Sequence, residues 1–369
     1  MNILFVTRPI TPPWNEGSKN LTWQLVSRLT RHTAYVLTTK GKKRPSSPHA
    51  SVHWLPIYTQ TQLTLWQKMR LLGCLALKPP PVDIFHFYFV PTLFTSRLLS
   101  TICRLHGKKS VQTIPSLPAE LPPATKMSAL IFADQVVVYS DFSLRRLNAL
   151  SIQNVTRIDA GIEVERWANA QPDSTLRQRL GAAEEAVLIL FAGEYARLGS
   201  VAVLKHIMPR VINHHPNAHF LIACRILSPA DLGIEAKLKQ MVQTQQLEQK
   251  VHFLGEVADF PALLRASDIF FFPVTEMAGK IDTPLTLLEA MAAGLPILTN
   301  DIRPLNEIEG LTDLSLASDN AALLEQLSQL VSSPALRREI GRYGQSRVEQ
   351  RYGLARMVTA YETLYDSFV

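Results

Sequence analysis

The sequence has little of what would indicate a secreted, metal-binding or membrane-spanning protein. Three of its 369 residues are cysteines, Cys74, Cys103 and Cys224, and they are odd in number, widely spaced and set in apolar surroundings. This pattern argues against a disulfide framework and against a zinc cluster, and it fits a reducing compartment. No apolar run reaches the roughly 18 residues of a transmembrane helix. The run at 3–6 is too short for a signal peptide, so we expect a cytoplasmic protein, soluble or membrane-associated.

Signatures of dinucleotide and nucleic-acid binding are also missing. No G-x-G-x-x-G follows the first apolar run, which weakens an interpretation as a nicotinamide-dependent dehydrogenase. No nucleic-acid-binding module is recognisable, so we expect no nucleic-acid partner. The net charge of +7 is uneven: residues 1–165 carry 19 Lys and Arg against 8 Asp and Glu, and residues 166–369 carry 19 against 23. The basic first half indicates an anionic partner, although a solvated surface with scattered lysines explains it equally well.

Short apolar runs alternate with helical patterns along the whole chain, which predicts parallel sheets covered by helices. At 47% hydrophobic residues the chain is long enough for two cores of ordinary size. Strands are expected at 2–7, 34–38, 52–57, 84–89, 110–113, 135–139, 186–192, 219–224, 251–254, 269–273 and 296–299. Helices are expected at 19–29, 201–214, 234–245, 260–266, 285–293, 321–331 and 354–365.

The alternation restarts near residue 186, after a polar, alanine-rich segment at 166–185 that resembles a linker. We therefore predict a Rossmann-like domain at 1–165, a second Rossmann-like domain at 175–345, and a C-terminal helix at 346–369 that packs back on the first domain. Two such domains in tandem would face each other across a cleft, and sheets of this kind bind ligands beyond the carboxyl ends of their strands.

The most specific stretch is EMAGKIDTPLTLLEAMAAGLP, residues 276–296. Asp282, Thr283 and Pro284 predict a helix start, with Asp or Thr as the cap and Pro in the first turn. The amides of Thr286 and Leu287 would then lie near an open helix N-terminus, where a diphosphate binds well.

Glu289 lies about one turn further along the same helix, among Leu, Ala and Met residues. A carboxylate in such surroundings needs a partner, and the vicinal hydroxyls of a ribose would supply one. The alternative is that Glu289 lies on an exposed face of the helix.

At this stretch the sequence resembles the family 4 glycosyltransferases of the two-Rossmann GT-B fold, and the match runs from MNILFVT to the terminal LYDSF. In that family a Glu and a Gly-rich turn precede a second Glu, Ala-Met-Ala, a small residue, Gly and Pro, and LLEAMAAGLP reproduces the second half. The resemblance implies that Glu289 binds the ribose of a nucleotide-sugar. It also implies an acceptor-binding first domain, a donor-binding second domain, retention of anomeric configuration, and no metal or other cofactor.

The chain departs from the family pattern where the donor sugar and phosphates would lie. Ile281 stands in place of the first Glu, and Asp282 or Glu276 could take its role on the sugar hydroxyls. After the first strand of the second domain, GEYARLG, which begins with Gly193 and Glu194, replaces the usual Gly-Arg and Lys-Gly. The substitute phosphate contacts are Arg197, Arg225 and Lys280, and a surface ion pair is the alternative for each.

In the first domain the family's Gly-rich loop is represented by residues 15–19, Asn-Glu-Gly-Ser-Lys, whose amides near Gly17 and Ser18 would approach the donor phosphate. Pro115 stands where many relatives carry a His. His86, in the apolar strand IFHFYF, is the remaining candidate from the first domain, and a hydrogen-bonded core histidine is its alternative.

Residues 59–78 form a basic amphipathic pattern that could lie on a membrane surface. With KGKKR at 40–44 it indicates a lipid-linked or membrane-bound acceptor and peripheral contact with an anionic membrane. A helix packed on the sheet is the alternative. The apolar positions are Leu63, Trp66, Met69, Leu72 and Leu75, and the basic ones are Lys68 and Arg70.

The sequence thus predicts a glycosyltransferase that moves a sugar from a nucleotide-sugar to a glycan or lipid-linked acceptor in cell-envelope polysaccharide or glycolipid synthesis. Two alternatives stay open: a non-catalytic GT-B-fold partner protein, indicated by Ile281 and Pro115, and a sugar-nucleotide epimerase. The catalytic candidates are Lys280, Asp282, Arg197, Arg225 and His86. The donor-binding candidates are Glu289, Thr286, Leu287, Gly17, Ser18, Gly193, Glu194 and Glu276.

Overall fold

The computed structural model describes residues 1–11, 16–41, 52–61, 64–89, 92–277 and 279–368. The chain forms two compact α/β units. Unit 1 comprises Met1–Ile162, Gly279–Asp282 and Leu354–Val369, and unit 2 comprises Glu163–Ala278 and Thr283–Gly353. The sequence analysis ended the second domain at 345, whereas unit 2 continues to 353 because α13 (Pro334–Arg351) is one uninterrupted helix.

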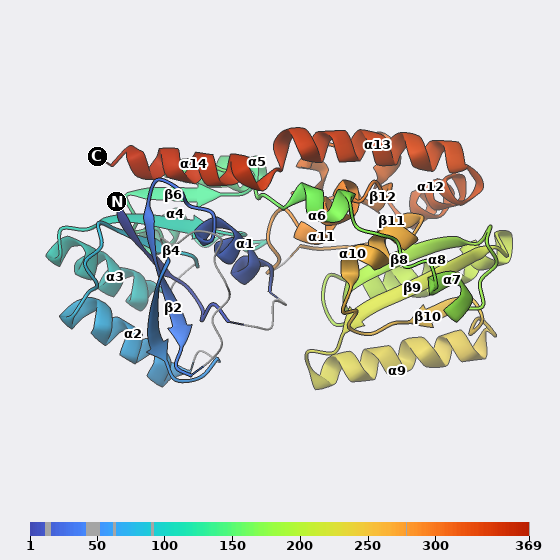
Figure 1. Cartoon of the computed structure of the whole chain (residues 1–369), viewed down its shortest axis with the longest axis horizontal. Coiled ribbons are helices and arrows are strands. Elements are labelled where there is room, and N and C mark those ends of the chain that lie inside the picture. Colours follow the sequence, from blue (N-terminus) through green and yellow to red (C-terminus); the bar gives the residue numbers. More distant parts are fainter. Residues whose placement is uncertain (12–15, 42–51, 62–63, 90–91, 278, 369) are drawn as a thin grey trace. The chain divides into compact units, whose positions relative to one another are not determined.

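Unit 1 contains a parallel sheet with the strand order β3-β2-β1-β4-β5-β6-β7 (Figure 1). The central strands are almost fully buried, which is why they read as continuous apolar runs. The strands are β1 (Asn2–Val6), β2 (Thr33–Thr39), β3 (Val52–Tyr58), β4 (Ile84–Phe87), β5 (Lys109–Ile114), β6 (Gln135–Val138) and β7 (Val155–Arg157). The helices are α1 (Gly17–Val26), α2 (Leu65–Leu77), α3 (Leu93–Leu105), α4 (Ala124–Leu130), α5 (Asp141–Asn148) and α14 (Leu354–Asp366).

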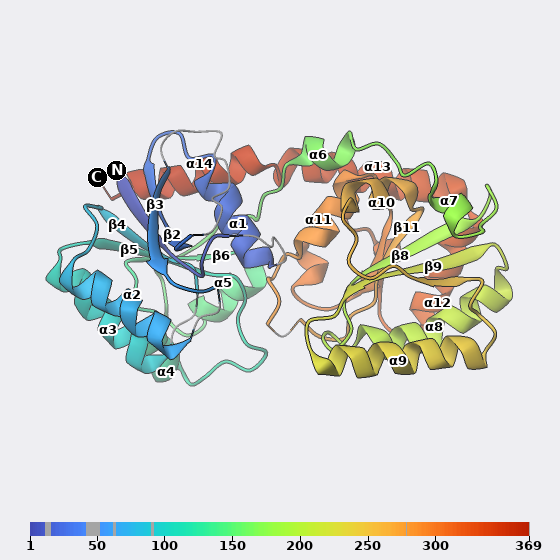
Figure 2. The same ribbon diagram turned by 60° about the horizontal axis from the view of Figure 1, so that its bottom comes forward.

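The helices of unit 1 cover the two faces of its sheet. Helices α2, α3 and α4 pack side by side on one face, and α14 lies beside α1 (Figures 1 and 2). Glu362 fastens α14 to the turn before β2, because its carboxylate accepts hydrogen bonds from the amides of Thr30 (2.6 Å) and Arg31 (2.8 Å) and from the Arg31 guanidinium (3.1 Å). Burial would raise the pKa of Glu362, but these hydrogen bonds hold it below its ordinary value.

Unit 2 contains a second parallel sheet, with the strand order β10-β9-β8-β11-β12-β13. Helices α8, α9 and α12 pack together, and α11 packs against α6 and α13. The strands are β8 (Val187–Glu194), β9 (Ala218–Arg225), β10 (Val251–Phe253), β11 (Ile269–Phe272), β12 (Ile297–Asn300) and β13 (Leu316–Ala317). The helices besides α13 are α6 (Val164–Ala168), α7 (Leu176–Arg179), α8 (Ser200–His214), α9 (Pro229–Thr244), α10 (Phe260–Ala266), α11 (Leu285–Ala292) and α12 (Asn320–Ser332).

The end of α11 lies where the sequence predicts it, and its beginning does not have the predicted cap. Gly294 has a φ of 80° and donates to the Met291 carbonyl (2.9 Å), while Leu295 donates to the Ala290 carbonyl (3.0 Å). These two bonds form the Schellman motif that a glycine allows. At the other end Pro284 occupies the cap position and makes no side-chain cap. The predicted Asp or Thr cap is therefore wrong.

Candidate functional site

The carboxyl edge of the unit 2 sheet brings together four of the sequence candidates. Gly193 and Glu194 end β8, and Arg225 ends the neighbouring strand β9, directly opposite Glu194 in the parallel register. Arg197, half-exposed in the loop after β8, contacts the buried Glu194 carboxylate at 3.4 Å. This edge therefore carries two guanidinium groups, and Glu194 partly neutralises that of Arg197.

The loop that follows β8 is held by groups from two other segments of unit 2. The buried Asp231 carboxylate accepts hydrogen bonds from the amides of Ala196 (3.0 Å) and Leu227 (3.1 Å). Burial would raise the pKa of Asp231, but the hydrogen bonds from Ser228 and these amides hold it below its ordinary value. Asp231 thus joins the loop after β8 to the loop after β9.

The end of the same loop has two consecutive residues in the left-handed conformation. Leu198 and Gly199 both have positive φ angles, 68° and 70°. Thr275 donates its amide to the Leu198 carbonyl at 2.8 Å. A Cβ atom on Gly199 would overlap the Thr275 hydroxyl. The loop is therefore fixed where it leads into α8.

The N-terminus of α11 only partly matches the predicted phosphate seat. The Leu287 amide donates to the Pro284 carbonyl at 3.1 Å, so it is already used within the first turn. Thr286, which is half-buried, lies one residue closer to the end of the helix, where backbone amides have no intrahelical acceptor. Of the two predicted amides, that of Thr286 is the better placed for an anion.

Glu289 lies on α11 in a half-buried position. Burial raises the pKa of its carboxyl to about 7, and Arg166 on the neighbouring helix α6 opposes this shift. The group is therefore partly protonated at neutral pH. A carboxyl desolvated to this degree lacks full charge compensation, which a ligand with hydrogen-bond donors could supply. Glu276, the other acidic donor candidate of unit 2, is exposed.

In unit 1 the structure places Asp282 against the N-terminus of α5. The buried Asp282 carboxylate accepts hydrogen bonds from the hydroxyls of Ser140 and Ser143, both at 2.5 Å, and its amide donates to the Pro115 carbonyl at 2.9 Å. A negative charge at a helix N-terminus is favourable. Asp282 therefore has structural partners that compete with the role predicted for it on sugar hydroxyls. Lys280, two residues earlier, is half-buried.

The residues of the predicted Gly-rich loop form the first turn of α1, which begins at Gly17, while Asn15 lies outside the described residues. Lys19 is buried and donates to the Thr11 carbonyl at 3.0 Å. Burial lowers its pKa. Gly17 faces Ile281 in unit 1, so the amides at Gly17 and Ser18 lie near the segment that carries Lys280 and Asp282.

His86 is fully buried in β4, and both of its ring nitrogens have partners. One contacts the Tyr365 hydroxyl and the other the Thr113 hydroxyl, each at 2.7 Å. Tyr361 extends the cluster, 3.1 Å from the Thr113 hydroxyl. Burial lowers the pKa of His86 to about 3, so it stays neutral at physiological pH. This geometry is that of a hydrogen-bonded core histidine which anchors α14, the alternative that the sequence left open.

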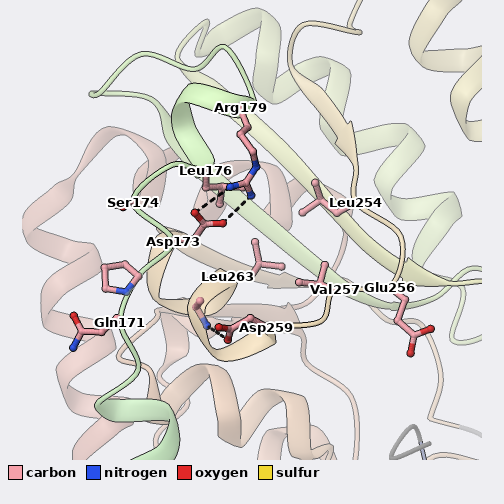
Figure 3. Close-up of a pocket in the computed structure, with 12 residues that line it drawn as sticks. Gln171, Asp173, Ser174, Leu176, Arg179, Leu254, Glu256, Val257, Asp259 and Leu263 are labelled. Carbon is pink, nitrogen blue, oxygen red and sulfur yellow. Dashed lines mark hydrogen bonds and ion pairs between the residues drawn. The ribbon is translucent and has the colours of Figure 1, made fainter.

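A cavity of about 610 Å³ lies in unit 2 at the carboxyl end of β10 (Figure 3). None of the sequence candidates lines it. Two of its carboxylates are already engaged, because Asp173 pairs with Arg179 at 2.7 Å and Asp259 caps α10 through the Ala262 amide at 3.0 Å. The Arg179 pair lowers the pKa of Asp173 to about 2. Glu256 at the cavity points away from this ion pair in Figure 3.

Several residues around the candidates were not found from the sequence. Asp231 had a readable signal, since Ser228 and Asp231 stand three residues apart at the start of α9, as in a capping box. Ser140 likewise caps α5. Arg166 had none, because its effect on Glu289 arises from the packing of α6 on α11. Among the described residues no cluster of three or more His, Cys, Asp or Glu side chains is arranged to hold a metal ion.

Comparison with known proteins shows which proteins this chain is similar to. Residues 186–333 match the family model of the group 1 glycosyl transferases. The lipopolysaccharide core biosynthesis mannosyltransferase LpsB of Rhizobium meliloti is 23% identical over 84% of this chain and 91% of its own length. The phosphatidyl-myo-inositol mannosyltransferase of Mycobacterium leprae is 29% identical over 56% of this chain and 54% of its own length. The chain thus spans about half the length of some curated relatives that it matches. It covers 54% of the phosphatidyl-myo-inositol mannosyltransferase and 48% of the N-acetyl-alpha-D-glucosaminyl L-malate synthase of Bacillus anthracis.

The solved structures agree on the architecture. HepE of Anabaena, crystallised with UDP-glucose, has a TM-score of 0.76 at 17% identity, over 99% of this chain and 100% of that chain. Sucrose-phosphate synthase from Thermosynechococcus elongatus has a TM-score of 0.78 at 16% identity, over 100% and 99% of the two chains. The chain has the GT-B fold, and residues 186–333, which include Glu289, match the family model of the group 1 glycosyl transferases.

Proposed function

We propose that this chain is a glycosyltransferase that moves a sugar from a nucleotide-sugar donor to a glycan or lipid-linked acceptor. The reaction would retain the anomeric configuration and serve cell-envelope polysaccharide or glycolipid synthesis at the cytoplasmic side of a membrane. Support for the donor class comes from HepE, crystallised with UDP-glucose. Support for the acceptor class comes from the relatives named for lipopolysaccharide core and phosphatidyl-myo-inositol.

The observation that carries the proposal is the Glu289 carboxyl on α11. Burial raises its pKa to about 7, so the opposing charge of Arg166 does not fully compensate the desolvation of this carboxyl. Two vicinal hydroxyls of a ribose would donate to both carboxylate oxygens and favour the ionised form. In this proposal Glu289 holds the nucleotide by its ribose, and ligand binding lowers the pKa of Glu289.

The donor diphosphate would be bound by cations and by helix amides. Arg225 and Arg197 at the carboxyl edge of the unit 2 sheet are the candidate cations of that unit, and Thr286 offers an amide at the start of α11. Lys280 is the candidate cation of unit 1. The groups of unit 2 would stabilise the charge that develops on the leaving nucleoside diphosphate, so the proposal needs no bound metal.

The test is nucleotide release from UDP-, GDP- and ADP-sugars, with and without lipid-linked acceptors. The wild type is compared with Glu289→Gln, which keeps the size of the side chain, and with Glu248→Gln, an exposed carboxylate of unit 2, as the control. We expect release from one donor class, a loss of tenfold or more in Glu289→Gln, and no change in Glu248→Gln. Equal release by all three proteins would refute the role of Glu289.

A second candidate is a non-catalytic GT-B protein that binds a nucleotide-sugar. Two observations favour it: Ile281 replaces the family's first Glu, and the neighbouring Asp282 carboxylate is bonded to two serine hydroxyls. Calorimetric titration with the same donors separates the candidates. Glu289-dependent binding without release, whatever the acceptor, would favour this candidate over the transferase.

A further inference from the structure

Helices α2 and α3 of unit 1 expose an unusual amount of apolar side chain. Six of the ten exposed large hydrophobic residues found in the described part of the chain lie on these two helices. We call the surface that these six side chains form the α2–α3 face. Their exposed fractions are 76% for Leu65, 72% for Trp66, 54% for Met69, 83% for Leu77, 73% for Phe94 and 78% for Leu105.

These six side chains are not needed for the core of unit 1. Each helix buries its opposite side, α2 through Leu75 and α3 through Leu99 and Ile102, which pack against Phe85 and Phe87 of the sheet. Leu75 had been assigned from the sequence to the amphipathic face together with Trp66 and Met69. The structure separates them, since Leu75 is buried. Leu63 and residues 42–44 of the KGKKR run lie outside the described residues.

The two helices present their exposed sides together. They run side by side in Figures 1 and 2, and His106, just after α3, contacts the Ala76 carbonyl near the end of α2 at 3.0 Å. Helix α2 follows β3 and α3 follows β4, and these strands run parallel within the sheet, so the two helices point in the same direction. Leu77 and Leu105 therefore lie at one end of the face, and Trp66 and Phe94 lie at the other.

The charge of the face is of one sign. Neither helix contains Asp or Glu, and the exposed charged residues of the face are all basic. They are Lys68, Arg70, Lys78, Arg97 and Arg104. The bias extends around the helices, because residues 17–119 contain 14 Lys and Arg and a single acidic residue, Asp83. An apolar surface interspersed with basic side chains matches a layer of apolar chains beneath anionic headgroups.

We propose that the α2–α3 face docks unit 1 on the surface of an anionic phospholipid bilayer. The rings and leucines enter the boundary between headgroups and acyl chains, while the lysines and arginines contact phosphate groups. The described residues contain no helix of the length and apolarity needed to cross a membrane, so the attachment is peripheral. The proposal rests on the proposed function in one respect, that the acceptor is lipid-linked, and it identifies the surface that brings the protein to such an acceptor.

Two kinds of interaction are needed together for stable attachment, because neither a few apolar side chains nor a few charges suffice. Each basic residue near an anionic surface strengthens binding about fivefold. Burying a large apolar side chain strengthens it roughly tenfold or more. The face offers both, so its apolar and charged variants are expected to weaken binding separately and to differ in salt dependence.

The experiment measures co-sedimentation with vesicles of phosphatidylcholine alone and of phosphatidylcholine mixed with phosphatidylglycerol. The variants are Trp66→Ser with Phe94→Ser, and Lys68→Glu with Arg97→Glu. Leu232→Ser and Lys237→Glu, at exposed positions of α9 in unit 2, are the matched controls. We expect binding of the wild type and both controls to the anionic vesicles, and at least a tenfold loss of partitioning in each double variant.

Circular dichroism of every variant checks that the fold is kept, since all substituted side chains are exposed. Nucleotide release without an acceptor is measured in parallel. Unchanged release with no vesicle binding by the wild type would overturn the membrane proposal and leave the proposed function standing. Vesicle binding without nucleotide release would support the membrane proposal and contradict the proposed function. The proposal would also be overturned if the wild type bound no vesicles and formed a dimer in sedimentation equilibrium that the apolar variant abolished. That result would show that this face joins two copies of the chain.

Discussion

Replacing Glu289 by Gln should make the ligand-free protein more stable at alkaline pH while impairing its activity. Burial moves the pKa of this carboxyl from 4.5 to about 7, a shift of 2.5 units. At about 1.4 kcal/mol per unit, the ionised carboxylate costs the folded state roughly 3 kcal/mol. Gln has nearly the same shape and carries no charge, so the substitution removes this cost.

The pH window follows from the direction of the shift. The unfolded chain loses the Glu289 proton near pH 4.5, whereas the folded protein keeps it until about pH 7. Between these values the folded state binds more protons than the unfolded state, so the free energy of unfolding falls as the pH rises. The loss is absent below pH 4.5 and complete above pH 7. Glu289→Gln and wild type should therefore be about equally stable at pH 4.5 and differ by roughly 3 kcal/mol at pH 8.

Urea unfolding at several pH values, followed by tryptophan fluorescence, measures this difference. Trp167 reports on unit 2, because the sequence of that unit contains one tryptophan and it is buried on α6 beside α11. Glu248→Gln, which removes an exposed carboxylate of the same unit, should show no gain at any pH. A stability difference between Glu289→Gln and wild type that does not change from pH 4.5 to pH 8 would refute the assigned pKa and the argument built on it. Saturating donor should cancel the pH-dependent gain, because the bound ribose stabilises the carboxylate.

Three further substitutions test the loops and the core. Gly199→Ala should lower the free energy of unfolding by roughly 1–3 kcal/mol and weaken donor binding. The control Gly233→Ala, within α9 and with open space around it, should raise the free energy of unfolding by up to about 1 kcal/mol, and equal effects of the two variants in urea titrations would contradict the strain at Gly199. Asp282→Ala leaves two buried serine hydroxyls without their acceptor and should cost roughly 2–4 kcal/mol, seen as a lower urea midpoint; an unchanged midpoint would show that these bonds contribute nothing. Tyr365→Phe removes one partner of His86 and should cost about 1–3 kcal/mol with unchanged release per folded molecule; a loss of release without a loss of stability would make His86 catalytic.

The sequence predicted the elements better than the contacts. Buried strands such as β1, β4 and β11 were readable because both faces of a parallel sheet are covered, so an apolar run marks each of them. The end of α11 was readable because Gly294 adopts a positive φ that other residues avoid. Both signals are local, since they depend on one residue or on a short run.

The candidate site could be predicted only in part because its contacts join residues far apart in the chain. Asp282 looks like a helix cap when only its neighbours are considered, but its carboxylate meets Ser140, 142 residues earlier. The charge opposing the pKa shift of Glu289 comes from Arg166, on a helix that the sequence showed only as a linker. His86 had two interpretations, and its contacts with the hydroxyls of Thr113 and of Tyr365, near the end of the chain, favour the core histidine.

The interleaving of the two units along the chain limits how such proteins can be recombined. The polypeptide leaves unit 1 after Ile162, returns for Gly279–Asp282, and returns again at Leu354. A fragment that stops at 162 would lack Tyr361, Glu362 and Tyr365, and the buried His86 would lose one of its two hydroxyl partners. Exchange of the first half between related enzymes, by gene shuffling or by design, therefore succeeds only if the C-terminal helix is transplanted with it.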